Sequence, residues 1–168
     1  MQTNETPRYD ASDNPTGCCP RFNPAGWDGA VMHFEQKPFV RARTHSVMHV
    51  PIDMGRVFGR VQRAIAEAGA DRPEARLVLS RDLSPYTAEH LFAVDRPVPG
   101  EEMTTLSGDF RARVFEGAYA KVRNWHRMLA PEAAHGPDDV WFFYTTCPKC
   151  ARVYGRNHVV GVVRTAGA

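Results

Sequence analysis

The sequence lacks long apolar runs and carries little net charge. Of its 168 residues, 21 are Lys or Arg and 19 are Asp or Glu, so the formal net charge is only +2. A balance this small does not favour nucleic acid or an anionic membrane surface as a partner. The apolar runs span only a few residues, too few for a transmembrane helix. We therefore expect neither nucleic acid nor a membrane among the partners.

The chain also lacks the pattern of a secretory signal. Residues 1–5 contain no basic segment followed by an apolar one. Hydrophobic residues make up 43 % of the chain, which is typical of one globular domain with a real core. The expected location is therefore the cytoplasm. In that reducing compartment, paired cysteines are more often metal ligands or redox groups than disulfides.

Cysteine is scarce, and its four copies form two pairs near opposite ends of the chain. Cys18 and Cys19 are adjacent, whereas Cys147 and Cys150 belong to a Cys-Pro-Lys-Cys segment. A Cys-x-x-Cys turn directs two thiolates at one ion, and Zn²⁺ takes four ligands in a tetrahedron. The sequence therefore predicts a structural Zn²⁺ site of four cysteines that ties the two ends together.

Other interpretations of the cysteines stay open. Side chains of neighbouring residues diverge in an extended chain, so a bend at Gly17 or Pro20 is needed to turn Cys18 and Cys19 toward one ion. In a mixed site, His33 or His158 would replace one of these two cysteines. Disulfides or free thiols are further alternatives. A redox role is less favoured, because the surrounding order of elements differs from that of thioredoxin-like proteins.

The order of predicted elements divides the chain into an extension and one domain. Residues 1–34 are rich in Asn, Asp, Pro, Thr and Gly and predict an irregular N-terminal extension that docks on the domain. Within the domain, 35–168, the order strand, helix, strand, strand occurs twice, in halves of about 38–98 and 102–165. This repeat predicts an α+β fold: an antiparallel sheet with two helices on one face and a central cleft on the other.

Carboxylates and aromatic side chains near strand ends are the candidates for a cleft. Glu116 ends one predicted strand, and Glu89 begins another beside His90. A buried carboxylate there would have a raised pKa and act as a general base or as a counter-charge to a ligand. The alternative is an exposed carboxylate at a strand end. His90 and four aromatic residues are the candidates for binding a ligand, and ordinary core packing explains the aromatic residues equally well: Phe92, Phe115, Trp141 and Tyr144.

The second half of the predicted domain contains the segment 108–119, Gly-Asp-Phe-Arg-Ala-Arg-Val-Phe-Glu-Gly-Ala-Tyr, near its start. Together with the twice-repeated unit, it resembles the gyrase-inhibitor-like small-molecule-binding family. The Thr-Gly-Cys-Cys-Pro and Thr-Thr-Cys-Pro-Lys-Cys segments are similar to small bacterial proteins labelled hydrolases. The resemblance implies a cleft for a hydrophobic, often cationic, small molecule. Family members that bind cations place a Glu on the penultimate strand, where this chain has Trp141 to Tyr144 and no carboxylate.

Three functions follow as hypotheses. The first is binding of a hydrophobic or cationic small molecule in the cleft, with the zinc site as a structural clamp. The second is hydrolysis of a small electrophilic compound by water that Glu89 or Glu116 activates. The third is a metal-stabilised interaction module without chemistry. The sequence leaves the ligand and the oligomeric state open.

Overall fold

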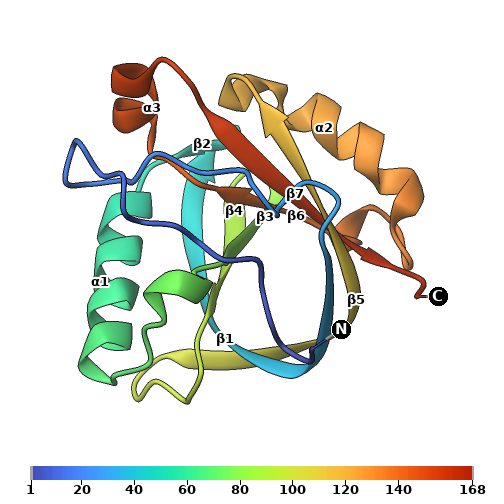
Figure 1. The fold of residues 1–168 in the computed structure, drawn as a ribbon, viewed down its shortest axis with the longest axis horizontal. Helices are drawn as coiled ribbons and strands as arrows, with labels where there is room; N and C mark the ends of the chain where they lie inside the picture. Colours follow the sequence, from blue (N-terminus) through green and yellow to red (C-terminus); the bar gives the residue numbers. More distant parts are fainter. Residues whose placement is uncertain (1, 168) are drawn as a thin grey trace.

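The structure is a computed structural model that describes residues 2–167, and its centre is an antiparallel β-barrel (Figure 1). Six strands pair in the order β1, β4, β3, β6, β7, β5, and β5 pairs again with β1 to close the ring. The strands are β1 (Val31–Val47), β3 (Val78–Ser84), β4 (Thr87–Ala93), β5 (Glu102–Glu116), β6 (Val140–Tyr144) and β7 (His158–Thr165). A seventh strand, β2 (Val50–Pro51), extends β1 at one edge.

This closure corrects the predicted fold class. The predicted α+β sheet was open, with two helices on one face and a free concave face. The barrel closes because β1 is longer than expected and bends. Residues 31–41 of β1 pair with β5, whereas residues 39–45 pair with β4. The bend lies at Gln36, whose φ of 48° accompanies a register shift between Phe34 and Lys37.

Three helices pack outside the barrel. The first, α1 (Met54–Glu67), buries Val57, Val61 and Ile65 against the outer face of β1 and β4. The second, α2 (Val122–Leu129), buries Trp125 and Leu129 against β6 and β7. The third, α3 (Pro148–Tyr154), follows Cys147 and stands near the N-terminal arm in Figure 1. Short 3₁₀ turns complete the fold at Pro73–Ala75, Tyr119–Lys121, Ala130–Glu132 and Pro137–Asp139. No helix among residues 2–167 has the length and apolar character needed to cross a membrane.

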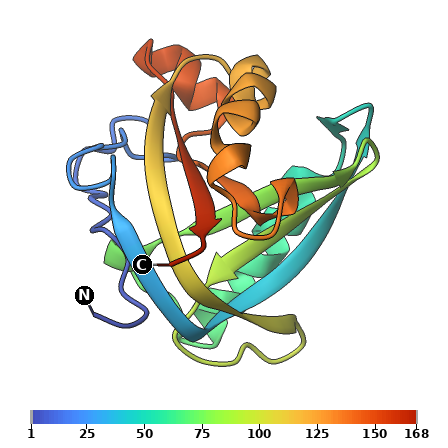
Figure 2. The same ribbon diagram turned by 90° about the vertical axis from the view of Figure 1, so that its right-hand side faces the viewer.

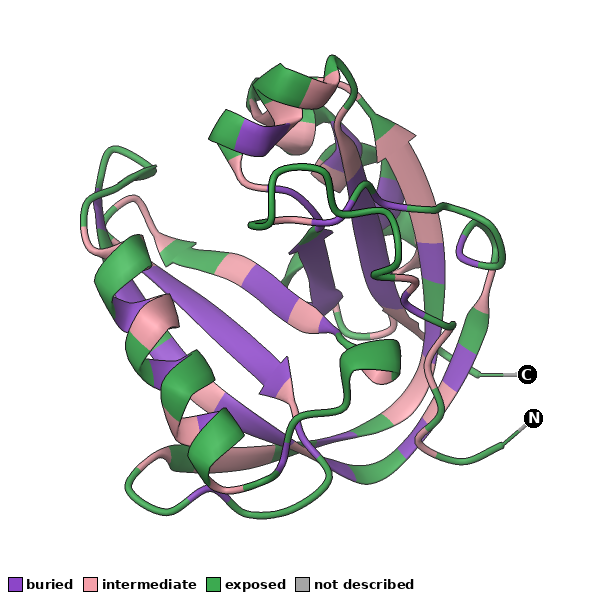
Figure 3. Ribbon diagram, turned by 60° about the vertical axis from the view of Figure 1, so that its left-hand side comes forward, coloured by how far each residue is buried: buried purple, intermediate pink, exposed green. Residues whose placement is uncertain are grey.

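Alternation along the strands fills the barrel with large apolar side chains. On β6, Trp141 and Phe143 point inward, while Phe142 packs under α2. Figure 3 shows the buried strand positions in purple. The interior is a packed core whose members are at most 9 % exposed: Met32, Phe34, Phe39, Leu77, Leu79, Leu91, Leu106, Phe110, Ala112, Trp141, Phe143, Val160 and Val162.

The N-terminal arm, residues 2–30, closes one end of this core. Tyr9, Phe22 and Trp27 are buried, and each ring lies within 6.5 Å of the Phe143 ring, centroid to centroid. The indole N–H of Trp27 donates to the Arg8 carbonyl (3.1 Å), so its polar atom is satisfied inside the contact. The arm therefore contributes to the core and lies against the strand that leads to Cys147.

Candidate functional site

The four cysteines come together at the junction of the arm and α3. Their Sγ atoms all lie within 4.8 Å of one another. Cys147 is the N-cap of α3, and Cys150 lies in its first turn, so the helix geometry places both thiols on one side. Cys18 and Cys19 reach them from a turn in which Gly17 has a φ of 72°. This is the bend that the sequence required.

The spacing of the sulfur atoms fits a tetrahedral metal ion. Four thiolates at about 2.3 Å from one Zn²⁺ lie roughly 3.8 Å from each other. The Cys18 and Cys19 sulfurs are 3.6 Å apart, well beyond a disulfide bond, and all four cysteines are free thiols in this structure. The cysteines can therefore hold a metal ion after a contraction of about 1 Å at most.

Hydrogen bonds around the sulfurs suit thiolates. The Cys147 N–H donates to Cys19 Sγ and the Cys150 N–H to Cys147 Sγ, both at 3.5 Å. The Thr16 hydroxyl lies 3.3 Å from Cys150 Sγ and, with the neighbouring thiols, lowers the pKa of Cys150 to about 7. Burial raises the pKa of Cys19 to about 12. A metal cation would supply the positive charge needed to keep all four sulfurs ionised together.

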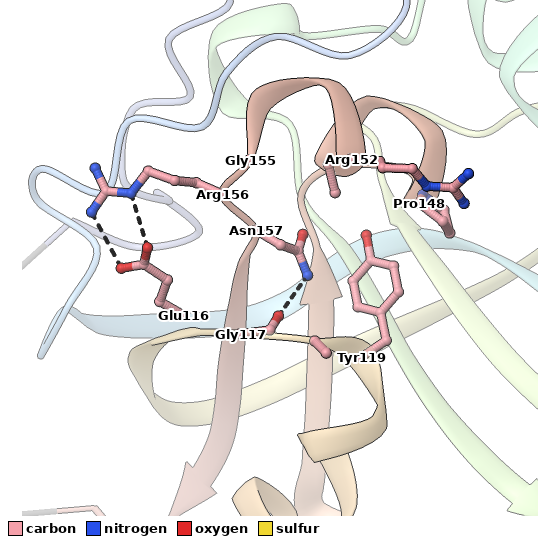
Figure 4. A pocket seen from close by; sticks show the side chains of 10 residues that line it. Glu116, Gly117, Tyr119, Pro148, Arg152, Gly155, Arg156 and Asn157 are labelled. Atoms are coloured by element: carbon pink, nitrogen blue, oxygen red, sulfur yellow. Dashed lines mark hydrogen bonds and ion pairs between the residues drawn. The ribbon is translucent and has the colours of Figure 1, made fainter.

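A shallow pocket of about 470 Å³ lies on the other side of α3 (Figure 4). One wall comes from α3 and the segment after it, and the opposite wall comes from the end of β5 and the turn that follows. The lining is Glu116, Gly117, Ala118, Tyr119, Pro148, Ala151, Arg152, Gly155, Arg156 and Asn157. Because Pro148 and Ala151 belong to the helix that carries Cys147 and Cys150, the cysteine site positions one wall of this pocket.

Two polar atoms in the pocket lining have no hydrogen-bond partner among residues 2–167: the Tyr119 hydroxyl and the Asn157 Oδ1 atom. The Asn157 amide nitrogen is used, since it donates to the Gly117 carbonyl at 2.9 Å. Burial raises the pKa of Tyr119, so its hydroxyl keeps its proton and can act as a donor. The residues of the pocket wall thus carry one buried donor and one buried acceptor without a partner, beside apolar side chains.

Glu116, a predicted catalytic residue, lies in this pocket lining. Its carboxylate receives hydrogen bonds from Arg156 Nε at 2.9 Å and from Nη2 at 3.3 Å. This guanidinium holds the pKa of Glu116 below its ordinary value, so the group is ionised at neutral pH. Figure 4 shows the Glu116–Arg156 pair and Tyr119 on opposite sides of Asn157.

Glu89 and His90, the other predicted pair, point to opposite faces of β4. Glu89 is 4 % exposed and joins an ion-pair cluster at the barrel end, with Arg41 Nη2 at 2.8 Å and Arg81 Nη2 at 3.6 Å. His90 is buried under α1, where its two ring nitrogens lie 2.8 Å from the Thr44 hydroxyl and 2.7 Å from the Ser80 hydroxyl. The two residues do not share a site.

The four aromatic residues predicted to line a cleft also separate. Phe92 packs under α1, and Trp141 lies inside the barrel. Phe115 stacks on Trp125 of α2, with ring centroids 5.0 Å apart. Tyr144 is 39 % exposed and meets the pocket residue Tyr119 edge to face at 5.3 Å. Sequence reasoning missed Arg152, Arg156 and Asn157, for which no local pattern gives a signal.

The buried imidazole of His90 predicts a loss of stability in acid. Burial lowers its pKa from 6.5 to about 4. Between these two pH values the unfolded chain binds a proton at His90, whereas the folded chain leaves this imidazole neutral. The free energy of unfolding should therefore fall by about 3 kcal/mol as the pH drops from 6.5 to 4. Above pH 6.5 the imidazole is neutral in both states, so this loss of stability is absent. Urea unfolding at several pH values measures this.

In that experiment the His90→Gln variant should show a shallower loss than the parent chain. The matched control is His135→Gln, because the His135 side chain is 74 % exposed. Equal pH slopes for the parent and His90→Gln would contradict a buried, neutral His90.

Comparison with known protein families identifies a relationship. The family model described as bacterial hydrolase matches residues 9–165, which include all four cysteines and the pocket lining. No curated protein and no solved structure matches the chain. The match covers nearly the whole chain and includes the arm that carries Cys18 and Cys19. The chain therefore belongs to the bacterial hydrolase family.

Proposed function

We propose that this protein binds a small molecule in the pocket beside α3 and that a structural Zn²⁺ ion, held by the four cysteines, keeps that pocket in shape. The proposal rests on one observation: a buried hydroxyl and a buried carbonyl oxygen, on Tyr119 and Asn157, line the pocket without a partner among the described residues. Leaving such a group unpaired costs about 1–3 kcal/mol, which a ligand with matching groups would recover.

The choice of zinc follows from the ligand set. Four thiolates in a tetrahedron suit Zn²⁺ or an iron ion, whereas hard cations prefer oxygen. A site with four protein ligands leaves no open position, so the proposed ion has a structural role and does not activate water. The reducing cytoplasm, predicted from the sequence, would keep these thiols available for the metal.

The side chains that line the pocket also indicate the chemical class of the ligand. Ala118, Pro148, Ala151 and the Tyr119 ring give apolar contact, as the sequence hypothesis of a hydrophobic ligand required. Two of the lining side chains are guanidinium groups and one is a carboxylate, so the formal charge is +1. The proposed ligand is therefore an apolar molecule with a neutral or anionic acceptor group. The gyrase-inhibitor-like resemblance, with its preference for cations, stays a prediction.

Hydrolysis is the second candidate, and the family match favours it. Glu116 is the ionised carboxylate in the lining, but its side chain is 50 % exposed and the Arg156 guanidinium, which lowers its pKa, makes it a weaker base than the buried carboxylate that the sequence hypothesis assumed. Glu116 would take a proton from water while the water oxygen bonds to an acyl carbon. The bond to the leaving alcohol would then break, and the alcohol would take up the proton. Tyr119 would donate to the acyl oxygen as negative charge develops there.

A fluorescent probe tests the pocket directly. Anilinonaphthalene sulfonate has apolar rings and an anionic sulfonate group that accepts hydrogen bonds, so we expect saturable binding to the folded parent chain. Ala151→Trp fills the pocket and should weaken binding at least about tenfold, and Tyr119→Phe, which removes the donor, about threefold or more. Ala66→Trp on the exposed face of α1 and Tyr86→Phe, at a tyrosine outside the pocket lining, are the matched controls.

The same variants separate the candidates. If Ala151→Trp binds the probe as tightly as Ala66→Trp does, the pocket is not the site. For hydrolysis, turnover of 4-nitrophenyl acetate should fall at least about a hundredfold in Glu116→Gln and stay unchanged in Glu67→Gln. Absence of turnover in the parent chain would reject hydrolysis of that ester and leave the binding proposal intact.

A further inference from the structure

Exposed apolar side chains gather at the ends of two neighbouring hairpins, β1–β2 and β3–β4. Ten large hydrophobic side chains are exposed among the described residues, and six of them lie here, with exposed fractions of 44–66 %. We name this group the apolar tip: Val47, Met48, Val50, Ile52, Leu83 and Tyr86. In Figure 2 the two hairpin ends, coloured teal and green, project together from the barrel on the side opposite the blue N-terminal arm.

Hydrogen bonds between the two hairpins hold the apolar tip in place. The Ser46 N–H donates to the Tyr86 carbonyl, and the His49 N–H donates to the Pro85 carbonyl, both at 2.8 Å. The His49 ring also lies 2.6 Å from the Asp82 carboxylate. The exposed side chains are therefore carried by a backbone that hydrogen bonds hold in place.

The turn at the apolar tip is conformationally strained. Val47 pairs with Val50, so Met48 and His49 form a two-residue turn, and their φ angles are 48° and 69°. Two positive φ angles in such a turn favour Asn-Gly, and the left-handed conformation is unfavourable for a residue like Met. Strain of this kind persists mainly at functional positions. The chain thus keeps an exposed Met where Asn would be more stable.

The shape of the apolar tip argues against a protein partner. A stable protein interface uses about 20–30 residues of all kinds on each side, whereas the apolar tip has six exposed apolar side chains on a narrow projection. Strand addition at the edge of β2 is also disfavoured, because Pro51 has no N–H group to donate. A few apolar side chains on a projecting, rigid tip are instead suited to the boundary between lipid headgroups and acyl chains.

The charges behind the apolar tip agree with a lipid surface. Asp53 receives the His45 N–H at 2.7 Å and lies 3.6 Å from Arg56, while Asp82 is engaged by His49. Arg43 is exposed and has no ion-pair partner among residues 2–167. Each of these two carboxylates therefore has a hydrogen-bond or ion-pair partner, and the exposed guanidinium of Arg43 adds attraction to an anionic surface.

We propose that the apolar tip inserts into the surface of a bilayer that contains anionic phospholipid and so docks the protein there peripherally. The apolar tip is separate from the pocket beside α3, so the membrane proposal does not depend on the proposed ligand or metal. The sequence predicted no membrane partner, because that prediction used only the overall charge and the length of apolar runs. Neither quantity reveals six apolar side chains that the fold brings together from residues 47–52 and 83–86.

Sedimentation with vesicles tests the proposal. The parent chain should bind vesicles of phosphatidylcholine mixed with phosphatidylserine and bind vesicles of phosphatidylcholine alone several-fold more weakly. Met48→Asn should weaken binding about fivefold or more, and Met48→Asn with Ile52→Asn about thirtyfold, because apolar area is lost from the lipid contact. Met128→Asn is the control, since Met128 is 53 % exposed on α2, outside the apolar tip.

Thermal melting removes misfolding as an explanation. Asn tolerates the left-handed conformation, so Met48→Asn should melt at or above the temperature of the parent chain. Failure of the parent to bind either kind of vesicle overturns the proposal, and so does equal binding by the parent and the double variant. A dimer in solution that Met48→Asn dissociates would also overturn it, because the apolar tip would then be an interface between copies.

Discussion

Replacing Cys147 by serine should abolish zinc binding and lower the melting temperature by roughly 10 °C. Cys147 does two things in the structure: its sulfur belongs to the four-cysteine group, and it caps α3. Structural zinc contributes its binding energy to folding, and a loss on the order of 4 kcal/mol corresponds to about 2–4 °C per kcal/mol in a chain of this size. Calorimetry with parallel metal analysis measures both effects.

The apo protein provides the matched comparison. After treatment with a chelator, the parent and Cys147→Ser chains should melt at nearly the same temperature, because the metal accounts for most of the difference. Re-addition of Zn²⁺ should restore the parent alone. If the Cys147→Ser chain had the same melting temperature as the untreated parent chain, the four thiols would not hold a stabilising ion.

A side chain at Gly161 should destabilise the protein by about 2–4 kcal/mol. Gly161 lies on β7 under α2, where an added Cβ atom would overlap Leu129 Cδ1 and stand 3.1 Å from Phe115 Cε2. Leu129 is fully buried and cannot move without opening the contact between α2 and the barrel. We expect Gly161→Ala near the lower value and Gly161→Val near the upper, measured by urea unfolding.

Gly59 is the control for this experiment. It lies within α1, and an added Cβ atom there meets nothing within 4 Å. Gly59→Ala should therefore stabilise the protein by about 0.5–1 kcal/mol, since Ala favours the helix more than Gly does. Two Gly→Ala changes of opposite sign would support the packing of α2 on β7, whereas a neutral Gly161→Ala would contradict it.

The sequence predicts most elements of this fold but not its closure. Alternation identifies the second half of β1, and helical spacing identifies α1. The first half of β1 is hidden, because Gln36, Lys37 and Pro38 interrupt the alternation. This half is the part that pairs with β5 and closes the barrel. Long-range pairing of this kind depends on a bend with a positive φ angle, which a local pattern does not encode.

The candidate site shows the same division. The four cysteines were recognisable, because metal ligands have characteristic types and spacing. The pocket beside them was not recognisable as a whole. Glu116 was named from its place at a strand end, but Tyr119 and Asn157 meet only because residues 117 and 157 are hydrogen-bonded neighbours in the closed barrel. Glu89 and His90 are adjacent in sequence and therefore point apart on a strand.

The coordination of the metal is the most direct test of this account. X-ray absorption at the zinc edge, on protein purified without a chelator, should find about one Zn²⁺ per chain with four sulfur neighbours at about 2.3 Å. Such a result requires Cys18, Cys19, Cys147 and Cys150 together, because the sequence has no other cysteine. Nitrogen or oxygen neighbours in the first shell, or less than about a tenth of an ion per chain, would contradict the clamp between the arm and α3.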